Sequence, residues 1–124
     1  MKTPRSSTPT ETSLLPLALS VFHILVVLAD GEKHGYAIMQ QTNKLSEGKF
    51  RMGPGTLYTT IQRLLDFCLI EEFSGSNDAG IRDSRRRYYR LTRQGKTLLD
   101  LEINRMGAVL RLASEKRLWP QVAK

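Results

Sequence analysis

The stretch of residues 53–70, GPGTLYTTIQRLLDFCLI, constrains the fold of this chain more than any other segment. Drawn as a helix, it places its apolar side chains on one side and polar or small ones on the other. The apolar side holds Leu57, Ile61, Leu64, Leu65 and Cys68. The other side holds Gly55, Thr59, Gln62, Arg63 and Asp66. The pattern predicts a helix that buries one side in a core and offers the other to a partner.

The offered side of this helix is uncharged in its first turns. It carries Thr56, Tyr58, Thr59 and Gln62, and Arg63 is its cation, with Lys49 and Arg51 just upstream. Such a mixture suits the base edges and the phosphates of DNA together. The alternative is an ordinary amphipathic surface helix, so the neighbouring segments have to decide between the two.

Length and charge narrow the choice of partner. A chain of 124 residues is expected to form a single domain with tails. Its 19 lysines and arginines against 12 acidic residues give a net charge of +7, which favours an anionic partner, either nucleic acid or a membrane surface. Residues 14–29 are very apolar, but they are fewer than the roughly 20 that a bilayer span needs. Because Ser20 and His23 also interrupt them, we expect a buried core helix and no membrane partner.

The first 13 residues and the cysteine content indicate the cellular compartment of the protein. Residues 1–13 are rich in Ser, Thr and Pro, which predicts a disordered arm rather than a signal peptide. Cys68 is the single cysteine and lies on the apolar side of the 53–70 helix, where we expect a buried thiol. No intramolecular disulfide can form, and a cytoplasmic location fits.

Two further helices are expected before residue 53. Pro16 and Gly31 bound an apolar run that predicts a helix over residues 16–30. An amphipathic pattern predicts a second helix over 35–46, and the alternation of residues 49–52 indicates a very short strand. Pro54 then opens the third helix. Two helices joined by a short glycine-containing connection, the second with a polar side, form a helix-turn-helix pattern.

A basic β-hairpin is expected after the third helix. Residues 69–75 and 85–92 are β-like runs around the polar loop 76–83, SNDAGIRD. The cations of this region stand against Asp83 alone, so a wing that lies along phosphates is favoured over a merely solvated strand end. They are Arg82, Arg85, Arg86, Arg87, Arg90, Arg93 and Lys96. Tyr88 and Tyr89 leave another alternative, because aromatics among arginines also stack single-stranded RNA.

The last segment predicts a long helix that opens at the N-cap Thr92 and runs to about residue 117. Some of its apolar residues step by four and three positions, which is the spacing of a helix that pairs with another helix. These are Leu99, Ile103, Met106 and Leu110. A second strip of Leu98, Val109 and Leu112 argues for burial against the helix's own domain as well as a partner. We therefore expect a homodimer.

Three short motifs connect these elements to a known family. They are His34-Gly35-Tyr36, Gly55-Thr56-Leu57-Tyr58, and the run from Arg87 to Thr92, RYYRLT, followed by Gly95. In this order and spacing the chain resembles the PadR family of winged-helix transcriptional regulators, in its short form with one C-terminal dimerisation helix. The resemblance covers about residues 16–115. It implies a mainly α fold with a small β-hairpin wing. Together with the arm at 1–13, we therefore expect a winged helix-turn-helix domain at 14–91, a dimerisation helix at 92–118 and a tail at 119–124.

The resemblance also implies a homodimeric bacterial repressor that binds a pseudo-palindromic operator and is released by a small ligand. The identity of the ligand does not carry over, and no cofactor or metal is implied. The implied contacts to double-stranded DNA map onto Tyr36, Lys44, Thr56, Tyr58, Thr59, Gln62, Arg63, Arg85 and Arg86.

Two other functions compete with this one. An enzyme is not expected, because the chain has two histidines, no glycine-rich phosphate loop and no nucleophile with a neighbouring base. A winged-helix module that binds protein or RNA instead of operator DNA is the serious alternative.

Overall fold

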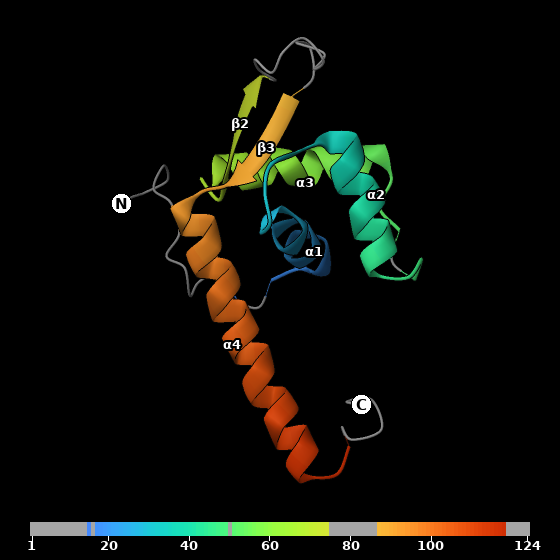
Figure 1. Cartoon of the computed structure of the whole chain (residues 1–124), viewed down its shortest axis with the longest axis vertical. Coiled ribbons are helices and arrows are strands. Elements are labelled where there is room, and N and C mark those ends of the chain that lie inside the picture. Colours follow the sequence, from blue (N-terminus) through green and yellow to red (C-terminus); the bar gives the residue numbers. More distant parts are fainter. Residues whose placement is uncertain (1–14, 16, 50, 75–86, 119–124) are drawn as a thin grey trace, which may run out of the picture.

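The computed structural model of the protein describes residues 15, 17–49, 51–74 and 87–118. Helix α1 lies between α4 and α2 and also contacts α3, while β2 contacts α3 and β3 contacts α1, α2 and α4 (Figure 1). This mainly helical fold with a small sheet is the predicted winged helix-turn-helix, with α2 and α3 as its helix pair. The elements are α1 (Leu19–Leu28), β1 (Lys33–His34), α2 (Gly35–Leu45), α3 (Pro54–Asp66), β2 (Ile70–Ser74), β3 (Arg87–Leu91) and α4 (Arg93–Glu115).

Helix α1 is shorter than predicted at both ends, spanning Leu19–Leu28 rather than 16–30. Ala18 is extended, with a ψ of 150°, and therefore serves as the N-cap instead of continuing the helix. The backbone N–H of Leu17 donates to the Glu102 carboxylate of α4 at 3.0 Å. The segment before α1 is thus held by a distant side chain rather than by helical hydrogen bonds.

The three strands form one antiparallel sheet in the order β1-β3-β2. Ile70 pairs with Leu91 at one end of the β2–β3 ladder and Ser74 with Arg87 at the other, as the predicted hairpin requires. Strand β1 does not follow from the sequence pattern, in which residues 32–34 have the composition of a turn. It pairs Lys33 with Tyr89 and therefore depends on a strand more than fifty positions away.

The short strand predicted over residues 49–52 is wrong for the residues that the structure describes there. Arg51 and Met52 lie outside any strand. The Met52 side chain is buried, and its backbone N–H donates to the Asn43 Oδ1 at 2.8 Å instead of to a neighbouring strand.

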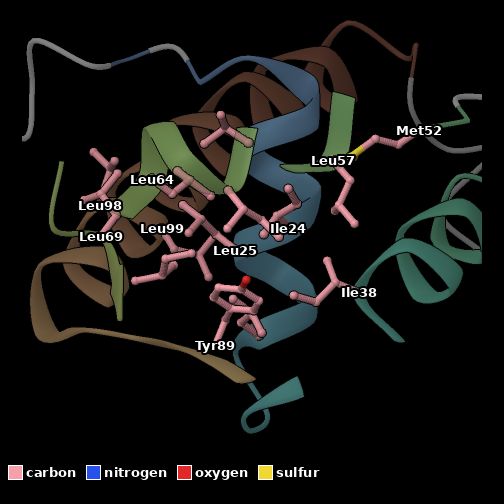
Figure 2. Close-up of a cluster of buried hydrophobic side chains, with 14 residues drawn as sticks. Ile24, Leu25, Ile38, Met52, Leu57, Leu64, Leu69, Tyr89, Leu98 and Leu99 are labelled. Atoms are coloured by element: carbon pink, nitrogen blue, oxygen red, sulfur yellow. The ribbon is translucent and has the colours of Figure 1, made fainter. Parts of the chain in front are cut away.

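One apolar cluster joins every helix to the sheet (Figure 2). Helix α1 supplies its centre, since Ile24 and Leu25 are completely buried. Around them pack Ile38 from α2, Leu57 and Leu64 from α3, Tyr89 from β3, and Leu98 and Leu99 from α4. This packing fixes the orientation of α3 relative to the start of α4.

The end of α3 corrects the expectation for Cys68. The backbone N–H groups of Cys68 and Leu69 donate to the carbonyls of Leu65 at 3.0 Å and Leu64 at 2.9 Å, the paired bonds of a Schellman motif. Cys68 holds the left-handed position with a φ of 61°. Because the helix has already ended, the helical period no longer applies, and the thiol is exposed rather than buried.

The start of α4 is fastened to this same junction. The Thr92 hydroxyl accepts from the Gly95 N–H at 3.0 Å, which confirms the predicted N-cap, and donates to the Cys68 carbonyl at 2.7 Å. The Thr92 N–H donates to the Leu69 carbonyl at 3.1 Å. Gly95 is buried directly against that carbonyl. Helix α4 therefore takes its direction from the end of α3.

Candidate nucleic-acid interface

Helix α3 presents its polar side as the sequence predicts. Its buried residues are Leu57, Thr60, Ile61 and Leu64. Thr56, Thr59, Gln62 and Arg63 are all exposed. The Thr60 hydroxyl donates to the Thr56 carbonyl at 2.8 Å, so this inner threonine is satisfied within the helix. The exposed side is free of the domain's own packing and available to a partner.

Four of the predicted contact residues line one shallow hollow of about 550 Å³ on this side. The lining consists of Tyr58, Thr59, Gln62, Arg63 and Asp66. The Gln62 Nε2 donates to the Asp66 Oδ1 at 3.1 Å, which orients the amide along the helix. One amide hydrogen and the amide oxygen remain for a base edge. Sequence reasoning placed Asp66 on this side but missed its contact with Gln62, although the i,i+4 spacing signals it.

Tyr58 ties the starts of α2 and α3 together. Its side chain covers Gly35, the first residue of α2, so closely that a Cβ at Gly35 would lie 2.9 Å from the Tyr58 Cζ and overlap its hydroxyl. The next residue, Tyr36, is 59% exposed. The His34 Nδ1 accepts from the Ala37 N–H at 3.3 Å and caps the same helix end. Tyr58 thus has a structural role besides the predicted DNA contact.

Lys44 is not gathered with the α3 residues. It is exposed near the far end of α2 and borders a separate groove of about 470 Å³ between α1 and α2. That groove is lined by Val26, Val27, Asp30, Gln41, Lys44 and Leu45. Any contact of Lys44 with DNA would be made from a different surface than the α3 hollow.

The wing arginines divide into two groups. Arg85 and Arg86 lie outside the described residues. Arg87 forms an ion pair with Glu72, and the Arg90 Nε pairs with the Glu71 Oε2 at 2.7 Å while its guanidinium lies 4.7 Å from the Phe73 ring centre. The prediction that the cations of this region stand against Asp83 alone is therefore wrong, because Glu71 and Glu72 also balance them. Antiparallel pairing brings Glu71 directly opposite Arg90 and places Glu72, which is opposite Tyr89, diagonally across from Arg87, and the predicted hairpin register could have shown both.

The tyrosines on which the RNA alternative depends are buried. Tyr88 is 8% exposed and Tyr89 5%. The Tyr88 ring meets the rings of His34 at 5.6 Å and Phe73 at 6.1 Å. Burial raises the pKa of Tyr89 above its ordinary value. Neither ring is presented for stacking with bases.

Helix α4 divides at about Glu102. Leu98 and Leu99 of its first half are buried in the core, so the assignment of Leu99 to a dimer surface is wrong. The reason is that the spacing of apolar residues along a helix shows which side is buried, but not whether the helix's own domain or a second chain covers that side. The second half extends beyond the other labelled elements (Figure 1). Its exposed large apolar side chains are Ile103, Met106, Val109, Leu110 and Leu112.

In the part of the chain that the structure describes, no helix combines the length and apolar character needed to cross a bilayer.

The chain is similar in sequence to one known protein family. The model of the transcriptional regulator PadR-like family matches residues 24–101. An uncharacterised protein of Lysinibacillus sphaericus is 33% identical over 76 residues, which are 61% of this chain and 67% of that protein.

Solved structures share the fold at lower identity. A PadR family transcription regulator of Clostridium difficile has a TM-score of 0.65 and 22% identity, covering 79% of this chain and 97% of that one. A PadR-like regulator of Bacillus cereus has a TM-score of 0.65 and 23% identity, covering 83% and 94%. Bacillus subtilis PadR in complex with operator DNA has a TM-score of 0.56 and 22% identity, covering 68% and 46%. With the family model matching more than half of its length, this chain belongs to the PadR-like family of transcriptional regulators.

Proposed function

We propose that the chain is a cytoplasmic, homodimeric repressor that recognises a pseudo-palindromic DNA operator and is released from it by a small molecule. The observation that carries the proposal is the α3 hollow, where Thr59, Gln62 and Arg63 stand exposed on a helix whose other side is locked into the core. The operator complex of Bacillus subtilis PadR, a protein of similar fold, supports DNA as the partner.

In this proposal α3 enters the major groove. Its hydroxyl and amide groups meet base edges, while Arg63 and the wing arginines Arg85 and Arg86 meet phosphates. Tyr36, Thr56 and Tyr58 complete this contact surface, and Lys44 meets the DNA from the separate groove between α1 and α2. The net charge of +7 supports this assignment, because positive charge attracts DNA regardless of its sequence.

The proposed dimer surface is the exposed apolar side of the second half of α4, represented by Ile103, Met106 and Leu110. One winged-helix unit contacts few bases. Two units related by a twofold axis reach half-sites one helical turn of about 34–36 Å apart, or a multiple of it. An apolar helix face that the described domain leaves uncovered supports a second copy as the body that covers it.

Gln62→Ala tests the proposed base reading. A base-edge hydrogen bond pair is worth about 1–3 kcal/mol of discrimination, so the variant is expected to lose its preference at one position in each half-site. Selection of binding sites from random DNA measures this. Gln41→Ala, which removes a glutamine from the α1–α2 groove, is the matched control and should keep the wild-type consensus. If Gln62→Ala selects the same consensus as wild type, then Tyr58 and DNA shape determine the sequence preference instead.

Changing Arg85 and Arg86 together to alanine tests the proposed phosphate contacts of the wing. Specific and non-specific affinity should fall alike, and the slope of log affinity against log salt should drop by about two units. Arg111→Ala with Arg117→Ala removes the same charge from the C-terminal part of the chain and should leave the slope near the wild-type value. Loss of affinity for the specific site alone would mean that the wing reads sequence.

The protein-binding alternative differs in its response to salt. DNA binding should weaken steeply as salt is added, by roughly one unit of log–log slope for each phosphate contact. An apolar protein interface should respond little. A titration of wild-type protein with DNA at several salt concentrations therefore separates the two functions.

A further inference from the structure

Glu102 is a carboxylate buried at the point where α4 leaves the domain. The residue is 2% exposed. Its Oε2 accepts the backbone N–H of Leu17 at 3.0 Å. The Arg105 guanidinium donates to the same carboxylate, from Nε to Oε1 at 2.6 Å and from a terminal nitrogen to Oε2 at 3.1 Å. Glu102 thus joins the segment before α1 to α4, across 85 positions of sequence.

Stability alone does not account for a charge at this site. Removing a carboxylate from water is costly, and an apolar side chain of similar size in the same place is often neutral or stabilising. The Arg105 guanidinium holds the pKa of Glu102 below its ordinary value, so the group is ionised at neutral pH. A buried charge that bonds to a specific backbone group selects one arrangement of the chain over others.

The arrangement that it selects is the direction of α4. A first anchor is the contact of Thr92 and Gly95 with the end of α3. Glu102 is a second anchor, about 10 Å further along the helix at 1.5 Å per residue. The residue after it, Ile103, is the first exposed apolar residue of the second half. Two anchors define a direction, and the second lies where the proposed dimer surface begins.

We propose that Glu102 is a positioning residue for operator spacing: by holding Leu17 it fixes the angle between α4 and α3, and so the distance and rotation between the two recognition helices of the dimer. This inference rests on the proposed function. It adds that a residue touching neither DNA nor, by its side chain, the dimer surface sets which separation of half-sites is accepted.

The exposed thiol of Cys68 allows a direct test without DNA. Cys68 is the single cysteine and lies just beyond α3, so a spin label there reports the distance between the two α3 helices of a dimer. Wild type should give one narrow distance distribution. Glu102→Leu, which fills the same space with an apolar side chain but loses all three hydrogen bonds, should broaden it at least about twofold. Glu102→Gln can still accept a hydrogen bond from one of the two donor residues, Leu17 or Arg105, but turns an amide NH₂ towards the other. This variant should broaden the distribution to an intermediate degree.

A spacing series gives the second readout. An operator selected by wild type is altered by one or two base pairs between its half-sites, each base pair adding about 3.4 Å and roughly 35° of rotation. Wild type should lose about tenfold or more in affinity for a change of one base pair, as expected from misplaced base contacts. Glu102→Leu should lose less than about threefold. Asp100→Leu, which breaks the exposed pair with Lys96 on the same helix, is the matched control and should behave as wild type.

The outcomes separate this inference from the proposed function. A narrow distribution and sharp spacing profile retained in Glu102→Leu overturn the positioning role while leaving the dimeric repressor intact. If Glu102→Leu does not fold, Glu102→Gln decides, and a wild-type distribution in that variant overturns the role equally. If the spin labels of the wild-type protein show no dipolar coupling between two chains, the proposed dimer itself is contradicted.

Discussion

Gly95→Ala is expected to lower the free energy of unfolding by about 3 kcal/mol or more, the range of a severe overpacking. A Cβ at this position would overlap the backbone carbonyl oxygen of Leu69 and lie 3.0 Å from its carbon and 3.2 Å from the Leu91 Cδ2. The backbone cannot easily give way, because the Thr92 N–H is bonded to that same carbonyl. The new methyl group would force α4 off the end of α3.

Urea unfolding at fixed protein concentration, without DNA, measures this effect. Gly55→Ala in the first turn of α3 is the matched control, since a Cβ added there would meet no atom of a neighbouring element within 4 Å. That variant should be unchanged or more stable by up to about 1 kcal/mol. A Gly95→Ala protein within about 0.5 kcal/mol of wild type, the size of an ordinary surface effect, would mean that the α3–α4 junction is looser than described.

Ile103→Glu together with Leu110→Glu is expected to abolish the dimer. Both side chains are large, apolar and more than 40% exposed in the chain by itself. Across a twofold axis the substitutions bury like charges, which is strongly unfavourable. The variant should sediment as a monomer at low micromolar concentration. Its affinity for a full operator should fall by about 100-fold or more, because linking two DNA-binding units raises the overall affinity by at least about that factor.

Asn104→Glu with Ala108→Glu is the control for this variant. It adds the same charge at exposed positions on the opposite side of α4 and should remain dimeric. A dimer that persists in Ile103→Glu with Leu110→Glu would place the interface elsewhere, with α1 as the next surface to test.

The helices that the sequence predicts well are those whose signals are local. Pro54 and the apolar period define α3, and Thr92 defines the start of α4, because caps and periodicity act within a few residues. The predicted start of α1 is wrong because Leu17 bonds to Glu102, which no local signal reveals. Strand β1 escapes prediction for the same reason, since its two residues are strands only through β3.

The candidate site is predicted well in its position on α3 and less well in its surroundings. Periodicity shows which side of α3 faces outward, but it does not extend past the helix end to Cys68, where the backbone has already turned. It also groups Leu99 with Ile103, although the body that covers each residue depends on where α4 leaves the domain. The pairing of Arg87 and Arg90 with glutamates becomes visible only with the strand register.

Selection of DNA by the wild-type protein from a random pool, followed by titration of the enriched site, shows whether the chain recognises an operator as a dimer. The enriched site should be an inverted repeat whose half-sites are centred about 34–36 Å apart or a multiple of it. Two chains should bind it, and added salt should weaken the binding steeply. Enrichment of no sequence, or a site bound by one chain with little response to salt, would contradict a dimeric operator-binding regulator.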